Sequence, residues 1–298
     1  MAAERQEKVM LKPGKAERVG SAINIAVLCI LTFITLYPFA YVVFASFSDP
    51  VAFMKHEGML LSPVSFSLKA YRQVFTNPTI YVGYANTIFY VAVGTLVNIL
   101  MTTTAAYVLS RKQLLLRRPI LLMFIFTMYF NGGLIPNYLL IQKLGLINNR
   151  LSLIIPVAVS TYNLLIMISG FESIPVALEE SARIDGANDL TILFRVIFPL
   201  AKPTIMVIML YYAVGHWNSW FNAMIYLRDS AKMPLQIFLR DILTRNQMGA
   251  MNAGSDIEDI GITIKYATII VSTLPILCIY PFIQKHFVKG VMIGAVKE

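Results

Sequence analysis

The chain has 298 residues, of which 57% are hydrophobic and only 14% are charged, and its formal net charge is +9. Average soluble domains contain roughly 45–50% apolar and about 25% charged residues. The composition therefore indicates lipid as the solvent for much of the chain and argues against an ordinary soluble enzyme.

Six long, nearly charge-free runs follow one another, and each is long enough to cross a bilayer as a helix of about 20 residues. They cover residues 21–47, 84–110, 119–141, 151–171, 203–227 and 262–281. The first follows a basic segment, as a signal peptide does, but its apolar stretch is too long and no small-residue cleavage site follows it. A helix satisfies its own backbone hydrogen bonds in lipid, so the sequence predicts an all-α membrane protein with six transmembrane helices.

The domain organisation expected from these runs is simple. Residues 1–20 form a polar N-terminal tail, and residues 21–298 form one membrane domain with its longest cytoplasmic loop at residues 173–202. The third run is the least regular, because residues 131–133 and Pro136 interrupt it.

The positive charges indicate the orientation of the chain. Fifteen lysines and arginines fall on the side of both termini and nine on the opposite side, and the short loop Arg111–Arg118 holds four of the fifteen. Cytoplasmic loops carry the excess of such residues, so both termini are expected in the cytoplasm. The net charge then reflects topology and contact with anionic lipid rather than with nucleic acid.

The cytoplasmic loop 173–202 begins with the features of a short helix. Ser173 can cap the helix, Glu179 lies in its N-terminal half, and Gly186 can end it in a left-handed conformation. Asn188 or Asp189 follows at once as a possible cap for another helix.

The second half of the loop has its own helical spacing of apolar residues, at Leu190, Leu193, Phe194 and Ile197, and Pro199 is expected to stop it. Two short helices would therefore meet at a glycine elbow on the membrane surface. The pattern alone leaves open an amphipathic hairpin that only lies on lipid.

The spacing of this loop resembles a known family. The residues that carry it are Glu180-Ser181-Ala182, Gly186, Val196 and Phe198-Pro199. They resemble the EAA loop of binding-protein-dependent ABC importer permeases, whose pattern is Glu-Ala-Ala, three residues, Gly, nine residues, Ile, one residue, Leu-Pro. The chain keeps the spacing and departs from the pattern by modest changes of size at residues 181, 196 and 198.

Other segments resemble the carbohydrate branch of the same family. They are residues 130–138, 184–187, 194–195, 217–221 and 287–294. Together they are similar to the second permease of Gram-positive-type oligosaccharide importers, and the resemblance covers nearly the whole chain. It implies the type I ABC importer fold with a cytoplasmic coupling helix, in a bacterial cell membrane.

The resemblance also implies partners and site residues. The partners would be a second homologous permease, two ATPase subunits that hold ATP and Mg, and an extracytoplasmic sugar-binding (lipo)protein. The residues expected to couple to the ATPase are Glu179, Glu180, Ala182, Asp185, Gly186, Ala187, Phe194 and Pro199. Glu180 would pair with a basic ATPase residue or cap local backbone, and Phe194 would anchor in a groove or pack on its own helices.

The chain itself is not expected to be an enzyme or to hold a cofactor. It has no Gly-x-x-x-x-Gly-Lys-Ser/Thr phosphate loop, so hydrolysis would occur on another chain. His56, His216 and His286 are far apart and lack metal-ligand spacing.

Polar and aromatic residues inside the apolar runs are the candidates for a sugar path, because aromatic faces stack on sugar rings and amides bind hydroxyls. They are Asn131, Tyr211, Trp217, Asn218, Trp220 and Asn222. Hydrogen bonds between helices or interfacial anchoring would explain the same residues. An oligosaccharide is the expected substrate, with acidic fragments of pectin or alginate as one form of it.

Three alternatives remain at this point. A secondary transporter would need a charged residue inside the membrane to couple ions, and the runs hold almost none apart from Lys265 near a helix end. A membrane scaffold that transports nothing would keep its assembly when residues 180–194 are deleted. An importer of something other than sugar also fits, since the carbohydrate assignment comes from the resemblance alone.

Overall fold

The computed structural model describes residues 14–249 and 261–278. These residues form helices and no named strand, apart from an isolated bridge between Ser48 and Phe66. Three helices are long and apolar enough to cross a membrane, and up to six spans result if each of three sharply bent helix pairs is one span. The all-α membrane fold is confirmed, while residues 1–13 and the segment 287–294 lie outside the described part.

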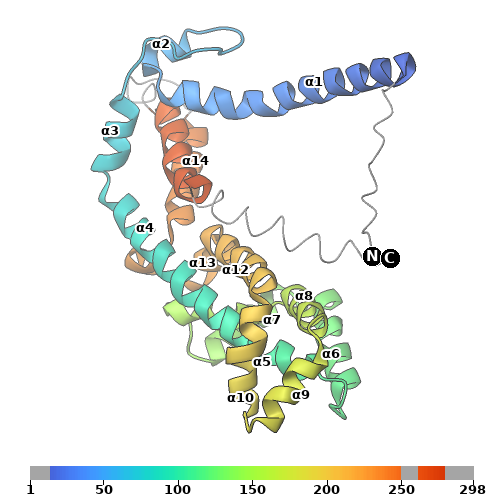
Figure 1. Cartoon of the computed structure of the whole chain (residues 1–298). Coiled ribbons are helices and arrows are strands. Elements are labelled where there is room, and N and C mark those ends of the chain that lie inside the picture. Colours follow the sequence, from blue (N-terminus) through green and yellow to red (C-terminus); the bar gives the residue numbers. More distant parts are fainter. Residues whose placement is uncertain (1–13, 250–260, 279–298) are drawn as a thin grey trace.

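The first helix, α1 (Lys15–Ser46), extends away from the rest of the molecule (Figure 1). It begins before the expected tail boundary at residue 20, because Lys, Ala, Glu and Arg at its start are good helix formers. No residue of its apolar membrane window is buried within the chain. Its apolar surface is therefore left for lipid or for another chain to cover.

Two short helices fill the loop after α1, namely α2 (Pro50–Met54) and α3 (Lys69–Thr76). Asp49 caps α2 by accepting a hydrogen bond from the backbone N–H of Val51 at 3.2 Å. The same carboxylate accepts a hydrogen bond from Lys69 Nζ at 2.9 Å, which joins the two helices.

The second span runs without a break through α4 (Pro78–Phe89), the π-helical turn η1 (Tyr90–Gly94) and α5 (Thr95–Ser110). The π turn lies where α12 (Lys202–Trp217) packs against this span. A Cβ at Gly94 would lie 2.5 Å from His216 Nε2, so only glycine allows this approach.

The third apolar run is broken, as the glycines and the proline in the sequence indicated. It consists of α6 (Arg117–Tyr129) and α7 (Leu134–Lys143), which are bent by 117° relative to each other. Gly133, with φ +92°, turns the chain at the break, and glycine adopts this region without a Cβ penalty. The interruption that the sequence showed at residues 131–133 is therefore confirmed as a sharp bend between two helices.

The fourth span is also interrupted. Two 3-10 turns, η2 (Arg150–Leu153) and η3 (Ile155–Val157), precede α8 (Thr161–Glu172) with a bend of 50°. The third bent pair joins residues 189–200 to α12 with a bend of 87°, and α13 (Phe221–Tyr226) follows α12 after a short break.

The last described elements are η5 (Ser230–Lys232), α14 (Leu235–Gly249) and a helix over Gly261–Cys278. Leu235, Ala267 and Val271 pack with Ala70 and Ile80 in one buried cluster. Figure 1 shows α14 beside α4, which this cluster explains.

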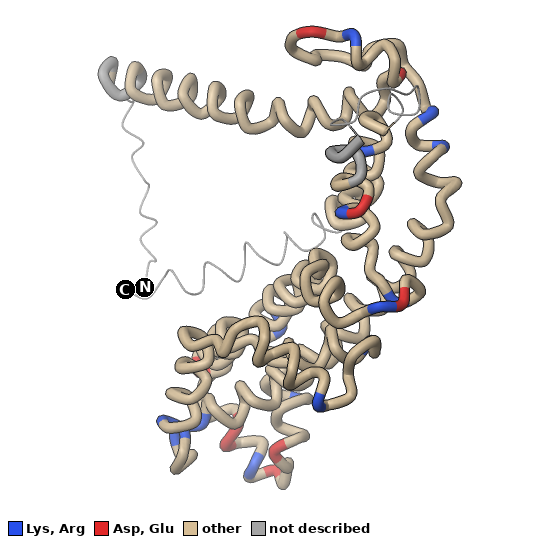
Figure 2. The backbone as a smooth tube through the Cα atoms, turned by 180° about the vertical axis from the view of Figure 1, so that it is seen from behind, with Lys and Arg blue, Asp and Glu red and all other residues tan. Residues whose placement is uncertain are grey.

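The main core lies where α5, α8 and α12 meet. Leu164, Met167 and Phe171 of α8 are fully buried there, together with Ile208 of α12. Figure 2 shows uncharged stretches along the long helices and charged residues gathered in the loops. They are densest at the end that carries α9 (Val176–Ile184) and α10 (Asp189–Ile192), which Figure 1 labels.

Candidate coupling surface and substrate pocket

The loop 173–202 forms two helical segments. The first, α9 (Val176–Ile184), starts after Pro175 without a side-chain cap. Ser173 does not cap it as expected, because its hydroxyl donates instead to the carbonyl oxygen of Gly170 at 2.7 Å. Pro175 occupies the N-cap position, and its carbonyl oxygen accepts the N–H of Leu178 at 3.2 Å, so the helix begins without the serine.

Gly186 forms the elbow that the sequence predicted. It has φ +83°, and a Cβ there would meet nothing within 4 Å, so the requirement for glycine comes from backbone conformation rather than from space. The N–H of Ala187 bonds the oxygen of Ala182 at 2.9 Å, and the N–H of Gly186 bonds the oxygen of Arg183 at 3.0 Å. This pair of bonds is the Schellman motif, which fixes the direction of the chain after the helix.

The second segment runs through α10 (Asp189–Ile192), the π turn η4 (Leu193–Ile197) and α11 (Phe198–Leu200). Asn188 caps it by accepting the N–H of Thr191 at 2.8 Å, as one of the two expected caps. Pro199 does not stop it, since the segment ends only at Ala201. Proline is tolerated because the π turn has already interrupted the regular hydrogen-bond ladder.

Glu179 is buried and joins the loop to the membrane helices. It is 4% exposed, forms an ion pair with Arg111, and accepts a hydrogen bond from Tyr107 Oη at 3.1 Å. The Arg111 guanidinium lies 4.5 Å from the centre of the Tyr107 ring. Because Tyr107 belongs to α5 and Arg111 follows it, this cluster attaches α9 firmly to the second span.

Arg183 extends the cluster towards the second segment. Its Nη2 lies 3.4 Å from Glu179 Oε1 and 2.6 Å from Asp189 Oδ1. The Asp189 carboxylate raises the pKa of Arg183, so the guanidinium stays charged. The two segments on either side of the elbow are therefore connected by an ion pair as well as by backbone.

The opposite side of the elbow is exposed and partly apolar. Ile184 is 87% exposed and Leu190 64% exposed, one on each side of Gly186. Phe194 is 44% exposed and lies against Phe198, with ring centres 6.3 Å apart. An exposed apolar patch of this kind marks a contact surface for a partner or for lipid.

The eight expected coupling residues thus divide into two groups. Glu179, Ala182 and Ala187 face inward, the two alanines against the main core. The exposed residues are Glu180, Asp185, Gly186, Phe194 and Pro199.

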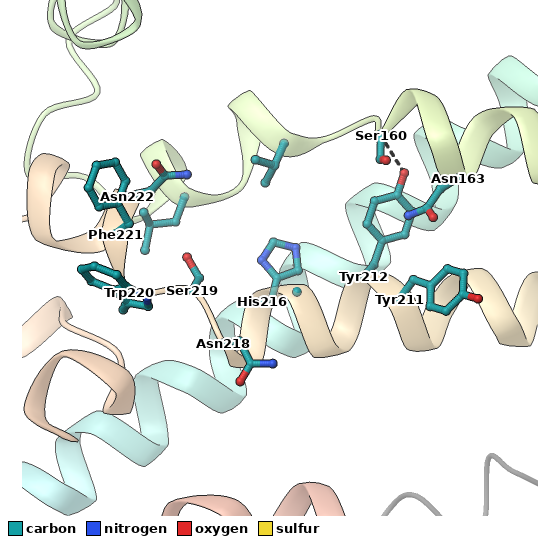
Figure 3. A pocket seen from close by; sticks show the side chains of 13 residues that line it. Ser160, Asn163, Tyr211, Tyr212, His216, Asn218, Ser219, Trp220, Phe221 and Asn222 are labelled. Carbon is teal, nitrogen blue, oxygen red and sulfur yellow. Dashed lines mark hydrogen bonds between the residues drawn. The ribbon is translucent and has the colours of Figure 1, made fainter. Parts of the chain in front are cut away.

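A pocket of about 520 Å³ lies beside the end of α12. Its walls are Leu153, Val157, Ser160, Asn163, Tyr211, Tyr212, Gly215, His216, Asn218, Ser219, Trp220, Phe221 and Asn222. The volume falls within the roughly 300–1,000 Å³ typical of small-molecule sites. Figure 3 shows His216 between the group Trp220–Asn222 on one side and Tyr212 on the other.

Four of the six expected path residues line this pocket, namely Tyr211, Asn218, Trp220 and Asn222. Trp217 does not, because it is buried against Tyr84 with ring centres 6.4 Å apart. Asn131 lies at the break between α6 and α7, where its Oδ1 accepts the N–H of Gly133 at 2.9 Å.

The chemistry of His216 is set by its neighbours. Asn98 donates through Nδ2 to the carbonyl oxygens of Val157 and Ala158, at 2.6 and 3.0 Å. Its Oδ1 is thereby fixed as the acceptor for His216 Nε2, at 2.7 Å. In the neutral ring Nε2 then carries the hydrogen, and Nδ1 is the acceptor that a sugar hydroxyl can use.

Tyr212 is a pocket residue that the sequence did not single out. Its hydroxyl bonds Thr102 at 2.8 Å and accepts the N–H of Ser160 at 2.9 Å (Figure 3). The signal was present, since a tyrosine deep in an apolar run needs a polar partner, but the identity of that partner depends on the packing of three helices.

The deciding comparison is with protein families. Residues 78–293 match the family model described as "Binding-protein-dependent transport system inner membrane component". The chain belongs to this family. Its members are membrane permease subunits of ABC importers, so this permease is a non-catalytic subunit.

Individual relatives agree with the family. This permease is 42% identical over 283 residues to the polygalacturonan/rhamnogalacturonan transport system permease protein YtcP of Bacillus subtilis, covering 93% of this chain and 96% of the relative. It is 41% identical to protein LplC of the same organism, covering 95% and 96%.

A solved structure resembles this permease along almost its whole length. It is the crystal structure of a bacterial ABC transporter involved in the import of the acidic polysaccharide alginate. The TM-score is 0.84 at 34% sequence identity, covering 93% of this chain and 100% of the other. The type I importer fold is therefore confirmed for this permease.

Proposed function

We propose that this permease forms half of the translocation pathway of an importer for acidic oligosaccharides, coupled to its ATPase by the exposed side of the α9–α10 elbow. The relatives named for polygalacturonan/rhamnogalacturonan transport and for alginate import support the substrate class. The observation that supports the coupling role is that the two sides of the elbow differ. The side that faces the membrane helices is attached to them by the buried Glu179–Arg111 ion pair, and the opposite side leaves the apolar side chains of Ile184 and Leu190 exposed.

The elbow has the properties of a rigid connection between two proteins. Movement imposed on Ile184 and Leu190 would pass through the Schellman turn and the Glu179–Arg111 pair into α5. The turn is held by backbone hydrogen bonds and the pair by a buried ion pair. ATP and Mg would be held by two partner ATPase subunits, whose closure favours one arrangement of the elbow over the other.

The remaining partners follow from the surfaces left open. A second permease chain would cover part of α1, whose apolar membrane window is not buried within its own chain. An extracytoplasmic sugar-binding protein would dock on the loops at the opposite end from α9. One membrane domain with a short N-terminal tail, and both termini in the cytoplasm of a bacterial cell, complete the proposed arrangement.

The pocket beside α12 suits a sugar. Trp220 and Phe221 offer ring faces for stacking, and Asn218 and Asn222 offer amides for hydroxyl groups. His216 also lines the pocket, and its Nδ1 is the acceptor nitrogen left by the bond of Nε2 to Asn98. We assign this pocket to the sugar path of the importer.

The coupling surface is tested by replacing one apolar residue on each side of the elbow, in Ile184→Glu and Leu190→Glu. A charge buried against the ATPase is expected to lower copurification of the ATPase subunit by about tenfold or more. Folding should be unchanged, because both side chains are exposed in the permease.

Leu115→Glu is the matched control, because Leu115 is 98% exposed in a different loop on the same side. If the elbow variants hold the ATPase as tightly as the control does, the elbow is not the coupling surface. The hairpin then lies on lipid only.

A further inference from the structure

A second cavity, of about 470 Å³, lies between the segments that precede η2 and surround η5. Its walls are Asn148, Asn149, Arg150, Asp229, Ala231 and Lys232. Both segments lie on the side opposite the coupling elbow in the proposed topology. None of these residues belongs to the pocket beside α12.

Asn148 holds the two walls of this cavity together. Its N–H bonds the oxygen of Tyr226 at 2.7 Å, and its Oδ1 accepts the N–H groups of Arg228 and Asp229 at 3.2 and 3.0 Å. Its φ of +58° is unusual for a residue other than glycine, although asparagine tolerates this region better than most. Backbone in such regions gathers at functional sites, where the surrounding structure enforces it.

Arg150 is positioned rigidly at the edge of the cavity. Asn86 donates through Nδ2 to the oxygens of Ala231 and Met233, at 2.8 and 3.1 Å, which leaves its Oδ1 to accept Arg150 Nη2 at 2.8 Å. The guanidinium also lies 5.0 Å from the centre of the Phe89 ring. The side chain is therefore held in place before any ligand arrives.

The charge of Arg150 is not neutralised within the described residues. None of their carboxylates lies within ion-pair distance of it, and its buried Nε makes no hydrogen bond there. A half-buried cation without a counter-charge is costly, and such residues in membrane transporters mark the path of charged cargo.

The other charges of the cavity leave a positive balance. Lys232 Nζ donates to the oxygen of Asn148 at 2.9 Å and lies 3.5 Å from Asp229 Oδ2, so the aspartate compensates the lysine and not Arg150. Arg228 adds a further cation one residue before Asp229. The cavity thus presents one positioned guanidinium in a net positive field, which suits a carboxylate.

The two cavities share a wall. Arg150 and Leu153 are the two ends of η2, and Leu153 lines the pocket beside α12. Across from η2 lies α13, which provides Asn222 to that pocket and Tyr226 to the anchoring of Asn148. The turn η2 therefore contributes one residue to each cavity.

We propose that this second cavity is a carboxylate subsite, where Arg150, with Lys232 nearby, binds a uronate carboxylate of the oligosaccharide while a neighbouring sugar occupies the pocket beside α12. The inference rests on the proposed import of acidic oligosaccharides. It assigns the recognition of the acidic group to a residue of this permease.

The test uses the complete complex of both permeases and the ATPase in lipid nanodiscs, without the binding protein. The probes are tetragalacturonate and the same tetramer with every carboxylate methyl-esterified, and the measurement is the dissociation constant of each. The free acid is expected to bind about tenfold more tightly than the ester at low salt, with a smaller preference at high salt.

Arg150→Gln is expected to remove this preference by weakening the acid about tenfold and leaving the ester within about twofold. Arg150→Lys retains part of it, because the charge remains while the forked geometry is lost. Lys143→Gln is the control for a general change of charge, since Lys143 is exposed on the same side and outside the cavity.

Three outcomes overturn the subsite. Equal loss of acid and ester in Arg150→Gln would show that Arg150 only supports the fold. Absence of any acid preference in the wild type, or of any binding, would reject it directly. A second measurement adds the binding protein, and an effect of Arg150→Gln seen only on its docking, whatever sugar it carries, would mean that the cavity receives an acidic side chain of that protein. Copurification of the ATPase with the permease tests the importer function separately, so the two failures can be told apart.

Discussion

Glu179 and Glu180 are neighbours in the sequence and have opposite surroundings. Consecutive residues of a helix point about 100° apart, so one carboxylate reaches Arg111 and Tyr107 while the other faces outward. Sequence spacing marked both as coupling residues. The structure assigns them different physical roles, an internal attachment for Glu179 and an exposed contact for Glu180.

Replacing Glu179 by glutamine should destabilise the loop, because Arg111 is left half-buried without its counter-charge. The expected loss is about 2–3 kcal/mol, measured by thermal or denaturant unfolding of the permease. Glu180→Gln, the matched control, should change stability by less than about 0.5 kcal/mol. Equal stability of the two variants would show that the buried pair contributes little.

Gly186→Ala should cost about 1–2 kcal/mol, because a residue with a Cβ must adopt left-handed backbone there. Gly186→Asn should cost less, since asparagine visits that region more readily. The measurement is unfolding together with ATPase copurification. Gly20→Ala, at a glycine inside α1 with open space around it, should not lower stability, because alanine is the better helix former there. A similar loss at both positions would exclude the backbone explanation.

At the scale of elements, the spans of this permease are shaped by irregular turns. The π turns η1 and η4, the glycine break before α7 and the 3-10 turns η2 and η3 all lie beside a site or a close contact. Glycine and proline in the sequence signalled the break at residues 131–136. Nothing local signalled η1, because a π turn in an apolar run depends on which helix packs beside it.

Gly94→Ala should disturb the contact of η1 with α12. The new Cβ would lie 2.5 Å from His216 Nε2, so the histidine must shift and loses its bond to Asn98. We expect a loss of about 1–3 kcal/mol in unfolding free energy. In the double variant with His216→Ala the clash is absent, so the two effects should be clearly less than additive; strict additivity would argue against direct contact.

At the scale of the whole molecule, two features bear on the proposed orientation in the membrane and on the proposed contacts with partners. They are the distribution of charge and the apolar surface of α1 that its own chain does not cover. The charged residues gather in the loops, most densely beside the coupling elbow. This arrangement follows from the cost of placing charges in lipid and from the positive-inside preference.

The proposed topology predicts the behaviour of reporter fusions. Green fluorescent protein at the C-terminus should fluoresce, and alkaline phosphatase there should be inactive, because the cytoplasm is reducing. A phosphatase fusion after Asp229, in the loop on the opposite side, should be active. Activity at the C-terminus would reverse the orientation and place the elbow outside the cell.

The sequence by itself determined that much of the chain lies in lipid, how many apolar segments it has and to which family it belongs. These properties depend on composition and on spacing along the chain. It also determined Gly186 as the elbow and Asn188 as one of two possible caps, since turn and cap chemistry is local. The four path residues that line the pocket could also be predicted from the sequence, because each is a polar or aromatic residue within an apolar run.

Only the tertiary structure decided which residues meet across the spans. Tyr107 and Glu179 are 72 positions apart, and Asn98 and His216 are 118 apart. The direction in which Glu179 points, the exclusion of Trp217 from the pocket and the position of Arg150 beside Asn86 all depend on how helices pack. The physical reason is that burial and pairing are properties of the packed bundle, and sequence spacing fixes only neighbours along one helix.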